Sequence, residues 1–181
     1  MRVPLVRLTG TLKSLSLLLC GVVLVLTAGC QTSQGGIQVS PSPKIQAFLG
    51  DEIIAVVSAP DRIEPFLLEA AFMPDPSLTG PTAIGGYTWK ARGADLPAVD
   101  IQWLSNLIMS QSSYDFEIAK KCPFVPEVAL RFHRGTDHVD VMVSQSCAMW
   151  QFEKGDAAKL EDFDPIKDQM KAIISSVFKI D

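Results

Sequence analysis

Residues 127–143 read EVALRFHRGTDHVDVMV, and this stretch decides the fold. Apolar residues alternate along both halves. The polar, glycine-containing sequence at 134–137 separates the halves, which predicts two antiparallel strands joined by a turn. A four-residue loop places six apolar side chains in facing pairs on one side, as a single buried face requires: Phe132 with Val139, Leu130 with Val141, and Val128 with Val143. The agreement between register and polarity predicts a hairpin with one buried face.

The opposite side of the predicted hairpin carries its charged and titratable side chains. Arg131 faces Asp140 there, and His133 faces His138. Together with Asp137, the two histidines and Asp140 form the one cluster with metal-ligand chemistry, because imidazoles and carboxylates bind divalent ions. A solvated hairpin tip with an Arg131–Asp140 cross-strand pair explains the same residues more simply. We therefore predict no metal site and keep His133, His138 and Asp140 as weak candidates.

Two cysteines lie at the open end of this hairpin. Extended outward, the register places Cys147 opposite Phe124, two residues from Cys122, although Pro123 and Pro126 prevent a regular ladder. In an exported protein a disulfide between the two thiols is the default, and it would close a loop of about 25 residues. The alternative is a pair of reduced, buried cysteines.

Three amphipathic helices are predicted from apolar residues at helical spacing. They cover residues 43–57, 97–109 and 164–179. Ser42 is expected to cap the first helix, with Gly50 on its polar side, and Asp164 is expected to cap the third.

Further strands are predicted at 62–68 and 84–90, and Pro65 is expected to confine the first of them to an edge of the sheet. After the hairpin, apolar positions change from odd to even numbers, so the chain must bulge or turn near 145–148. Residues 154–162 are charged and are predicted to form a loop.

Together these elements predict one α+β domain over residues 44–181. In it, about three helices pack on a small, mostly antiparallel sheet.

The first thirty residues have the composition of an export signal. Arg2, Arg7 and Lys13 precede an apolar run of about 12 residues, and no acidic residue is present. A helix needs about 20 residues to span the hydrocarbon core, so a cleaved signal is a better interpretation than a transmembrane helix. The run ends in Leu26-Thr27-Ala28-Gly29-Cys30, in which small residues precede a cysteine.

This ending resembles the lipobox of bacterial lipoproteins. The resemblance implies that Cys30 receives a diacylglycerol, that a peptidase removes residues 1–29, and that the new amino group is acylated. Two or three acyl chains hold a protein stably at a membrane, whereas one does not. The alternative is an ordinary secretory signal with a chance cysteine.

The same resemblance suggests a location. Gln31, by similarity to Gram-negative sorting rules, favours the outer membrane with the domain facing the periplasm; in other hosts the cell membrane is expected. Residues 30–43 then form a flexible tether between the lipid and the domain.

Composition bears on function. The leader holds three of the 16 basic residues and none of the 20 acidic ones, so the mature chain would carry a net charge of −7, which gives no support for nucleic-acid binding. No phosphate-binding loop, dinucleotide fingerprint or serine-hydrolase motif is present, and no cofactor is predicted.

The sequence therefore favours a non-catalytic envelope lipoprotein that binds a protein or small ligand or has a structural role. It does not favour an enzyme. A periplasmic metal-binding module using His133 and His138 is one alternative, and a cysteine-based redox protein is the other.

Overall fold

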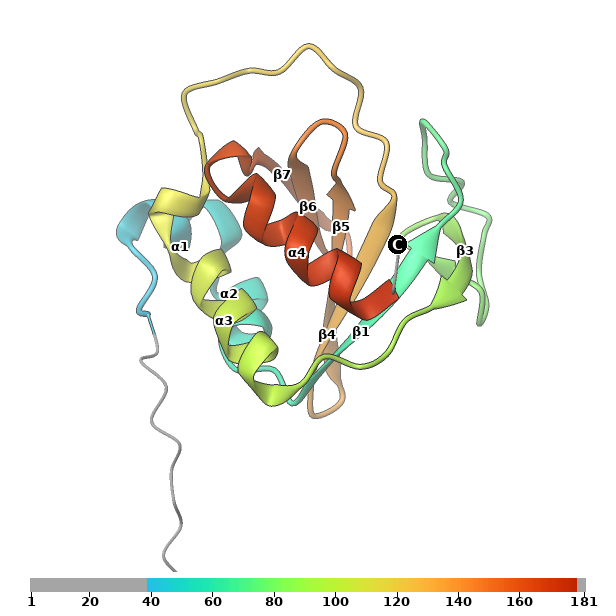
Figure 1. Cartoon of the computed structure of the whole chain (residues 1–181), viewed down its shortest axis with the longest axis horizontal. Helices are drawn as coiled ribbons and strands as arrows, with labels where there is room; N and C mark the ends of the chain where they lie inside the picture. The colour runs from blue at the N-terminus through green and yellow to red at the C-terminus, as the bar shows by residue number, and fades with distance from the viewer. Residues whose placement is uncertain (1–38, 179–181) are drawn as a thin grey trace, which may run out of the picture. The chain divides into compact units, whose positions relative to one another are not determined.

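The computed structural model describes residues 39–178, which form a seven-stranded antiparallel sheet and four α-helices (Figure 1). The strand order is β2-β3-β1-β4-β5-β6-β7. The strands are β1 (Arg62–Leu68), β2 (Ala83–Ile84), β3 (Tyr87–Arg92), β4 (Val128–Arg134), β5 (Asp137–Ser144), β6 (Met149–Lys154) and β7 (Ala157–Asp162). The helices are α1 (Pro43–Leu49), α2 (Asp51–Val57), α3 (Ala98–Met109) and α4 (Lys167–Phe178), with 3₁₀ turns at Gln111–Ser113 and Asp164–Ile166. The predicted α+β class is confirmed.

The β4–β5 hairpin has the predicted register along its whole length. Its six inward-facing apolar side chains are at most 1% exposed. The turn is shorter than predicted, because Arg134 pairs with Asp137 and only Gly135 and Thr136 connect the strands. Gly135 has a φ of 59°, a conformation that glycine adopts without steric cost.

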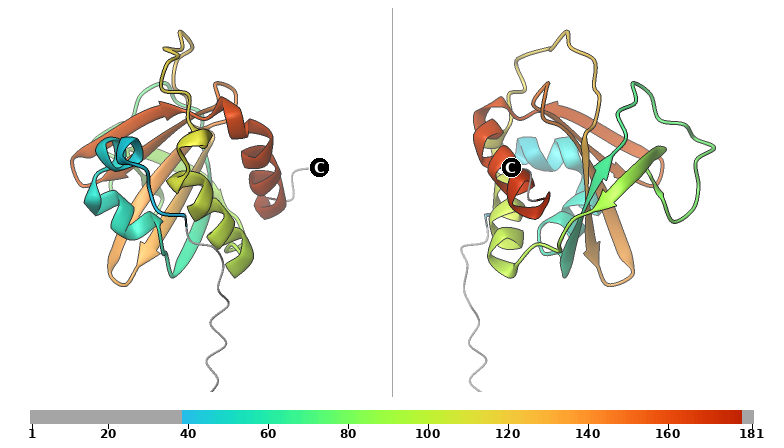
Figure 2. Two further views of the ribbon diagram at one scale, coloured as in Figure 1. Left: turned by 90° about the vertical axis from the view of Figure 1, so that its left-hand side faces the viewer. Right: turned by 45° about the vertical axis from the view of Figure 1, so that its right-hand side comes forward.

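All four helices pack on the face of the sheet that these six side chains define (Figures 1 and 2). Trp150, Phe132, Phe152 and Phe163 are the largest fully buried side chains in this core, and each is at most 1% exposed. Every helix adds apolar residues to the same cluster. The main core therefore lies between one helical layer and one sheet face, where burial of apolar surface stabilises the fold.

The other face of the sheet has two different halves. Over one half, the β2–β3 hairpin curls across the sheet, and Phe66, Leu68, Tyr87 and Met142 form part of a second small core. Gly85 in the hairpin turn has a φ of 55°, and a methyl group there would meet the Met142 side chain. Glycine adopts this backbone conformation without steric cost, whereas a methyl group would also force the end of the Met142 side chain to shift. The other half of this face is polar.

The predicted helix over residues 43–57 is divided in two. Ser42 caps α1 as predicted, since its Oγ accepts a hydrogen bond from the backbone N–H of Ile45 at 3.3 Å. Gly50, at φ 77° and ψ 161°, then leaves the helical conformation, and α2 begins at Asp51. The prediction of one continuous helix was wrong because the apolar stripe continues across a glycine that can end a helix.

The prediction that Pro65 confines β1 to an edge was also wrong. β1 lies between β3 and β4. Pro65 pairs with Leu130 of β4, and on its other side its carbonyl accepts a hydrogen bond from the N–H of Gly93 at 2.9 Å. Since the N and C=O of a strand residue point the same way, the missing N–H of Pro65 faces Gly93, just beyond the end of β3. Pairing with β4 loses no hydrogen bond.

Two strands differ from the sequence-based expectation. Gly85 and Gly86 both have positive φ, and they turn the predicted strand at 84–90 into a hairpin. Residues 157–162, predicted to be a loop, form β7 at one edge of the sheet. Of the six β7 residues only Asp162 is buried, so the sequence of β7 shows no alternation of apolar and polar residues.

The remaining junctions follow the expectation in part. The chain turns at 145–148 between β5 and β6, which gives the predicted change of face. The helices at residues 98–109 and 167–178 lie where amphipathic helices were predicted. Asp164 does not cap α4: a 3₁₀ turn precedes that helix, and the Asp164 carboxylate pairs with Lys120.

The proposed leader, Cys30 and residues 31–38 lie outside the described residues. Between residues 39 and 178, no helix has the length and apolar character needed to cross a bilayer.

Candidate functional site

The polar half of the outer sheet face carries a network of charged side chains centred on Glu64 of β1. Its Oε2 lies 2.5 Å from Nε2 of His133 on β4. Its Oε1 accepts hydrogen bonds from Arg62 at 2.9 Å and from Arg92 at 3.0 Å. The Glu64 side chain is only 15% exposed. A partly buried carboxylate with this many donors is fixed in one orientation.

The electrostatics of Glu64 follow from these partners. Burial opposes ionisation, but the hydrogen bond with His133, the positive charge of Arg62 and the hydrogen bond from Arg92 outweigh it, so the pKa of Glu64 lies below its usual value. The ionised form of Glu64 is therefore favoured, and it holds the side chains of His133, Arg62 and Arg92 around it. A carboxyl that acts as a general acid has its pKa shifted in the opposite direction.

Arg131 and Asp140 form the cross-strand pair that the sequence predicted. Nε and Nη2 of Arg131 donate to the two carboxylate oxygens of Asp140 at 2.7 and 2.8 Å. This hydrogen bonding raises the pKa of Arg131 above its usual value despite burial. The pair is bidentate and partly buried, a geometry that holds β4 and β5 in register.

An open hollow of about 310 Å³ lies beside this pair, where the β2–β3 turn approaches the ends of β5 and β6. Its lining includes His138, Asp140 and Glu153. Burial, together with repulsion from Asp140, raises the pKa of Glu153, although a hydrogen bond from Gln151 opposes the shift. Asp137 at the rim pairs with Lys154 at 3.0 Å.

The predicted weak metal candidates are thus brought to one surface, but most are engaged with other partners. His133 contacts Glu64, Asp140 binds Arg131, and the two imidazole rings are 6.2 Å apart between centroids. Within residues 39–178 no three His, Cys, Asp or Glu side chains are placed to share one ion. The geometry does not favour the metal-binding alternative.

The predicted disulfide joins Cys122 to Cys147, with 6.3 Å between their Cα atoms and 25 residues of separation. Nearby, Nζ of Lys120 lies 2.8 Å from Asp162 and 2.9 Å from Asp164. Burial opposes the charge on Lys120, yet its two carboxylate partners raise its pKa. The bridge and these ion pairs fasten the long segment before β4 to the β5–β6 turn and the end of β7.

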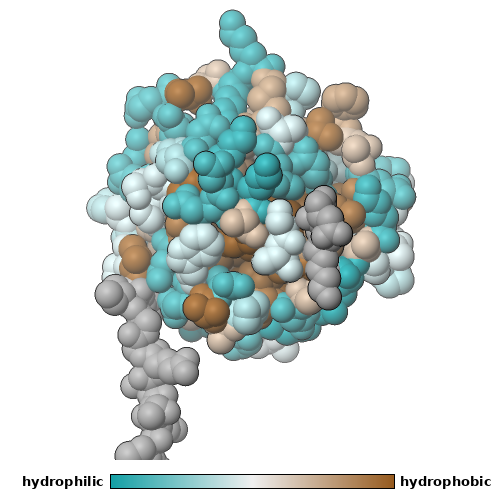
Figure 3. Space-filling model, viewed as in Figure 1, coloured by the Kyte–Doolittle hydropathy of each residue, from teal (hydrophilic) through white to brown (hydrophobic). Residues whose placement is uncertain are grey.

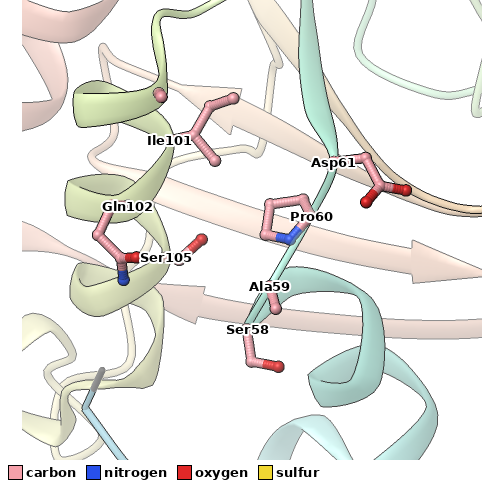
Figure 4. A pocket seen from close by; sticks show the side chains of 8 residues that line it. Ser58, Ala59, Pro60, Asp61, Ile101, Gln102 and Ser105 are labelled. Atoms are coloured by element: carbon pink, nitrogen blue, oxygen red, sulfur yellow. The ribbon is translucent and has the colours of Figure 1, made fainter. Parts of the chain in front are cut away.

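A second hollow, of about 290 Å³, lies between α3 and the segment at 58–61 that follows α2 (Figure 4). Figure 4 shows Ile101 and Ser105 projecting from α3 toward Pro60. The Ser105 residue is 2% exposed, and its hydroxyl finds no hydrogen-bond partner within the described part of the chain. An unpaired buried hydroxyl is costly, so this hollow offers one unused polar group to a small ligand or a water molecule.

Sequence reasoning missed Glu64 and Glu153. Glu64 belongs to no motif, although its alternation with Ile63 places it on the face opposite the main core. Its partners come from three strands, and only the strand order brings them together. Glu153 lies opposite Asp140 in the β5–β6 ladder. The sequence predicted a bulge or turn near 145–148 but not its length, so the register between β5 and β6 could not be derived from it.

We compared the chain with models of protein families, with curated proteins and with solved structures, and none of the three comparisons found a match.

Proposed function

We propose that this protein is a bacterial lipoprotein of the cell envelope, anchored through acylated Cys30, whose domain acts by binding and not by catalysis. The observation that carries the proposal is the sequence Leu26–Cys30 at the end of a short apolar run with a basic start. The Cys122–Cys147 disulfide supports it, since such bridges persist in oxidising compartments outside the cytoplasm.

Binding is favoured over catalysis because of how the charged groups are used. Glu64, Arg131 and Asp140 are held in ion pairs with neighbouring strands, an arrangement that fits a structural role. Both cysteines of the domain are joined to each other, so neither is a free thiolate nucleophile. A small ligand would find its best polar partner at Ser105, in the hollow beside α3.

The anchoring is tested by expressing the full chain in a Gram-negative host and measuring the mass of the mature protein. We expect a species that begins at Cys30 and carries acyl chains, in the membrane fraction. A Cys30→Ser variant should lose the acyl mass and leave that fraction. Recovery of the wild-type chain with Met1 intact, or trimmed and free of acyl mass, would contradict the proposal.

Membrane choice is tested separately with residue 31. The wild-type chain, with Gln31, is expected in the outer membrane, whereas Gln31→Asp should hold the lipoprotein in the inner membrane. Separation of the two membranes on a density gradient distinguishes the outcomes. Equal distribution of the two chains would refute the assignment to the outer membrane and leave the lipid anchor itself unaffected.

A further inference from the structure

One side of α3 exposes two large apolar side chains. Val99 is 72% exposed and Trp103 is 38% exposed. They are four residues apart, so they lie on the same side of the helix, and Asn106 continues this stripe three residues further on. Figure 3 shows that the helical face of the molecule otherwise carries small apolar patches among mainly hydrophilic side chains.

The opposite side of α3 is already occupied by the body of the domain. Leu104 and Ile108 are buried in the main core, and Ile101 and Ser105 line the hollow against the segment at 58–61 (Figure 4). Within residues 39–178 no element covers Val99. The exposed stripe is therefore an outer surface of the domain.

The first described residues contact the Asn106 end of this stripe and the turn that follows α3. The backbone N–H of Val39 donates to Oδ1 of Asn106 at 3.2 Å, and Oγ of Ser42 hydrogen bonds to Gln111 at 2.8 Å. Residue numbers rise in the same direction on both segments, so of these two residues Val39, the first described, is the nearer to Trp103. Figure 1 shows this segment beside α1 and α3.

We propose that the Val99 and Trp103 stripe of α3 rests on the surface of the bilayer that holds Cys30. The inference depends on the lipid anchor proposed above. Eight residues separate Cys30 from Val39, so the Asn106 end of the stripe lies at most about 30 Å from the acylated sulfur, at ~3.3 Å per residue.

The chemistry of the stripe fits a lipid surface. Tryptophan is enriched at the membrane–water interface, where its ring meets acyl chains and its N–H meets water or headgroups. Because the acyl chains already hold the protein at the bilayer, the second contact is intramolecular and needs little affinity of its own. The mature chain is acidic, and anionic headgroups would repel it, so the contact is made with zwitterionic phospholipids.

The test places the acylated full-length mature protein in phosphatidylcholine vesicles whose acyl chains carry bromine, which quenches tryptophan fluorescence on contact. We expect brominated vesicles to lower the emission of the wild-type protein, relative to unbrominated vesicles. The loss should persist in Trp89→Phe, a matched control in another part of the fold, and disappear in Trp103→Phe. Val99→Asp should weaken it while leaving the far-ultraviolet circular dichroism spectrum unchanged.

Each other outcome overturns the inference. Protein that floats with the vesicles but shows equal emission with and without bromine has a lipid anchor and no α3 contact. Trp103 that is shielded from aqueous iodide in vesicle-free detergent solution, with a doubled molecular mass, marks the stripe as an interface between two copies. Protein that does not float at all refutes the lipid anchor, and this inference fails with it.

Discussion

The Cys122–Cys147 bridge gives the most quantitative prediction. It joins two residues separated by 25 positions and closes a loop that contains the irregular segment before β4, all of β4 and all of β5. In the chain-entropy model a closed loop of this length lowers the entropy of the unfolded chain enough to stabilise the fold by about 3.5 kcal/mol. Replacing both cysteines by serine should remove that contribution.

The assay is urea denaturation of the purified mature protein, followed by tryptophan fluorescence. With a denaturant slope of about 1–3 kcal/mol/M, the loss corresponds to a fall of roughly 2 M in the urea midpoint. Reducing agent should lower the midpoint of the wild-type protein by a similar amount, because Cys122 is exposed and accessible. The same reagent should leave the double variant unchanged, which separates loss of the bridge from general effects of reduction.

A change below about 1 kcal/mol would refute the reasoning, since the bridge would then add no more than an ordinary surface contact. An equal effect of reductant on the double variant would show that the bridge is not the source of the stability. Counting free thiols under denaturing, non-reducing conditions provides an independent check, because an oxidised pair leaves neither Cys122 nor Cys147 free.

Four further predictions concern particular residues. The pKa of Glu64 is lowered in the fold, so its carboxylate stabilises the protein above pH 4.5, the usual value, and this stabilisation is lost as the pH falls through the folded pKa. In thermal melts at acid pH, the melting temperature of Glu64→Gln should therefore fall less steeply with pH than that of the wild-type protein. The pKa of Glu153 is raised in the fold, so its ionised form opposes folding at neutral pH. Glu153→Gln should therefore raise the melting temperature at pH 7 but not below pH 4.5. A rise in melting temperature that persists in acid would contradict this role of the Glu153 charge. Gly85→Ala should lower the free energy of unfolding by about 3 kcal/mol, against about 1 kcal/mol for Gly135→Ala, because both residues have positive φ but only at Gly85 would a methyl group displace the ends of neighbouring side chains. Equal losses in urea denaturation would show that this close approach is unimportant. Phe132→Ala should lower the free energy of unfolding by about 3–5 kcal/mol, since the ring is fully buried, and a loss near zero would mean that the main core is misplaced.

The sequence determined the central hairpin, its register and its buried face. Alternation has a period of two, so a shift of one residue would place Leu130 and Phe132 in water, and only one register sorts the apolar residues. That register brought Cys122 near Cys147 and set Arg131 opposite Asp140, and both pairs are present in the structure. Local pattern was sufficient here because the partners are near in sequence.

Tertiary structure alone decided which strands neighbour this hairpin. Nothing in the sequence near Pro65 shows that its missing N–H faces Gly93, so β1 could not be placed between β3 and β4. The surroundings of Glu64 depend on that placement, because His133 is 69 residues away in sequence and Arg92 is 28 residues away. The sequence of the edge strand β7 shows no alternation either, since only Asp162 of its six residues is buried. The spacing of apolar residues indicates which side of a helix or strand is buried, but the pairing of strands that are distant in sequence depends on the packing of the whole chain.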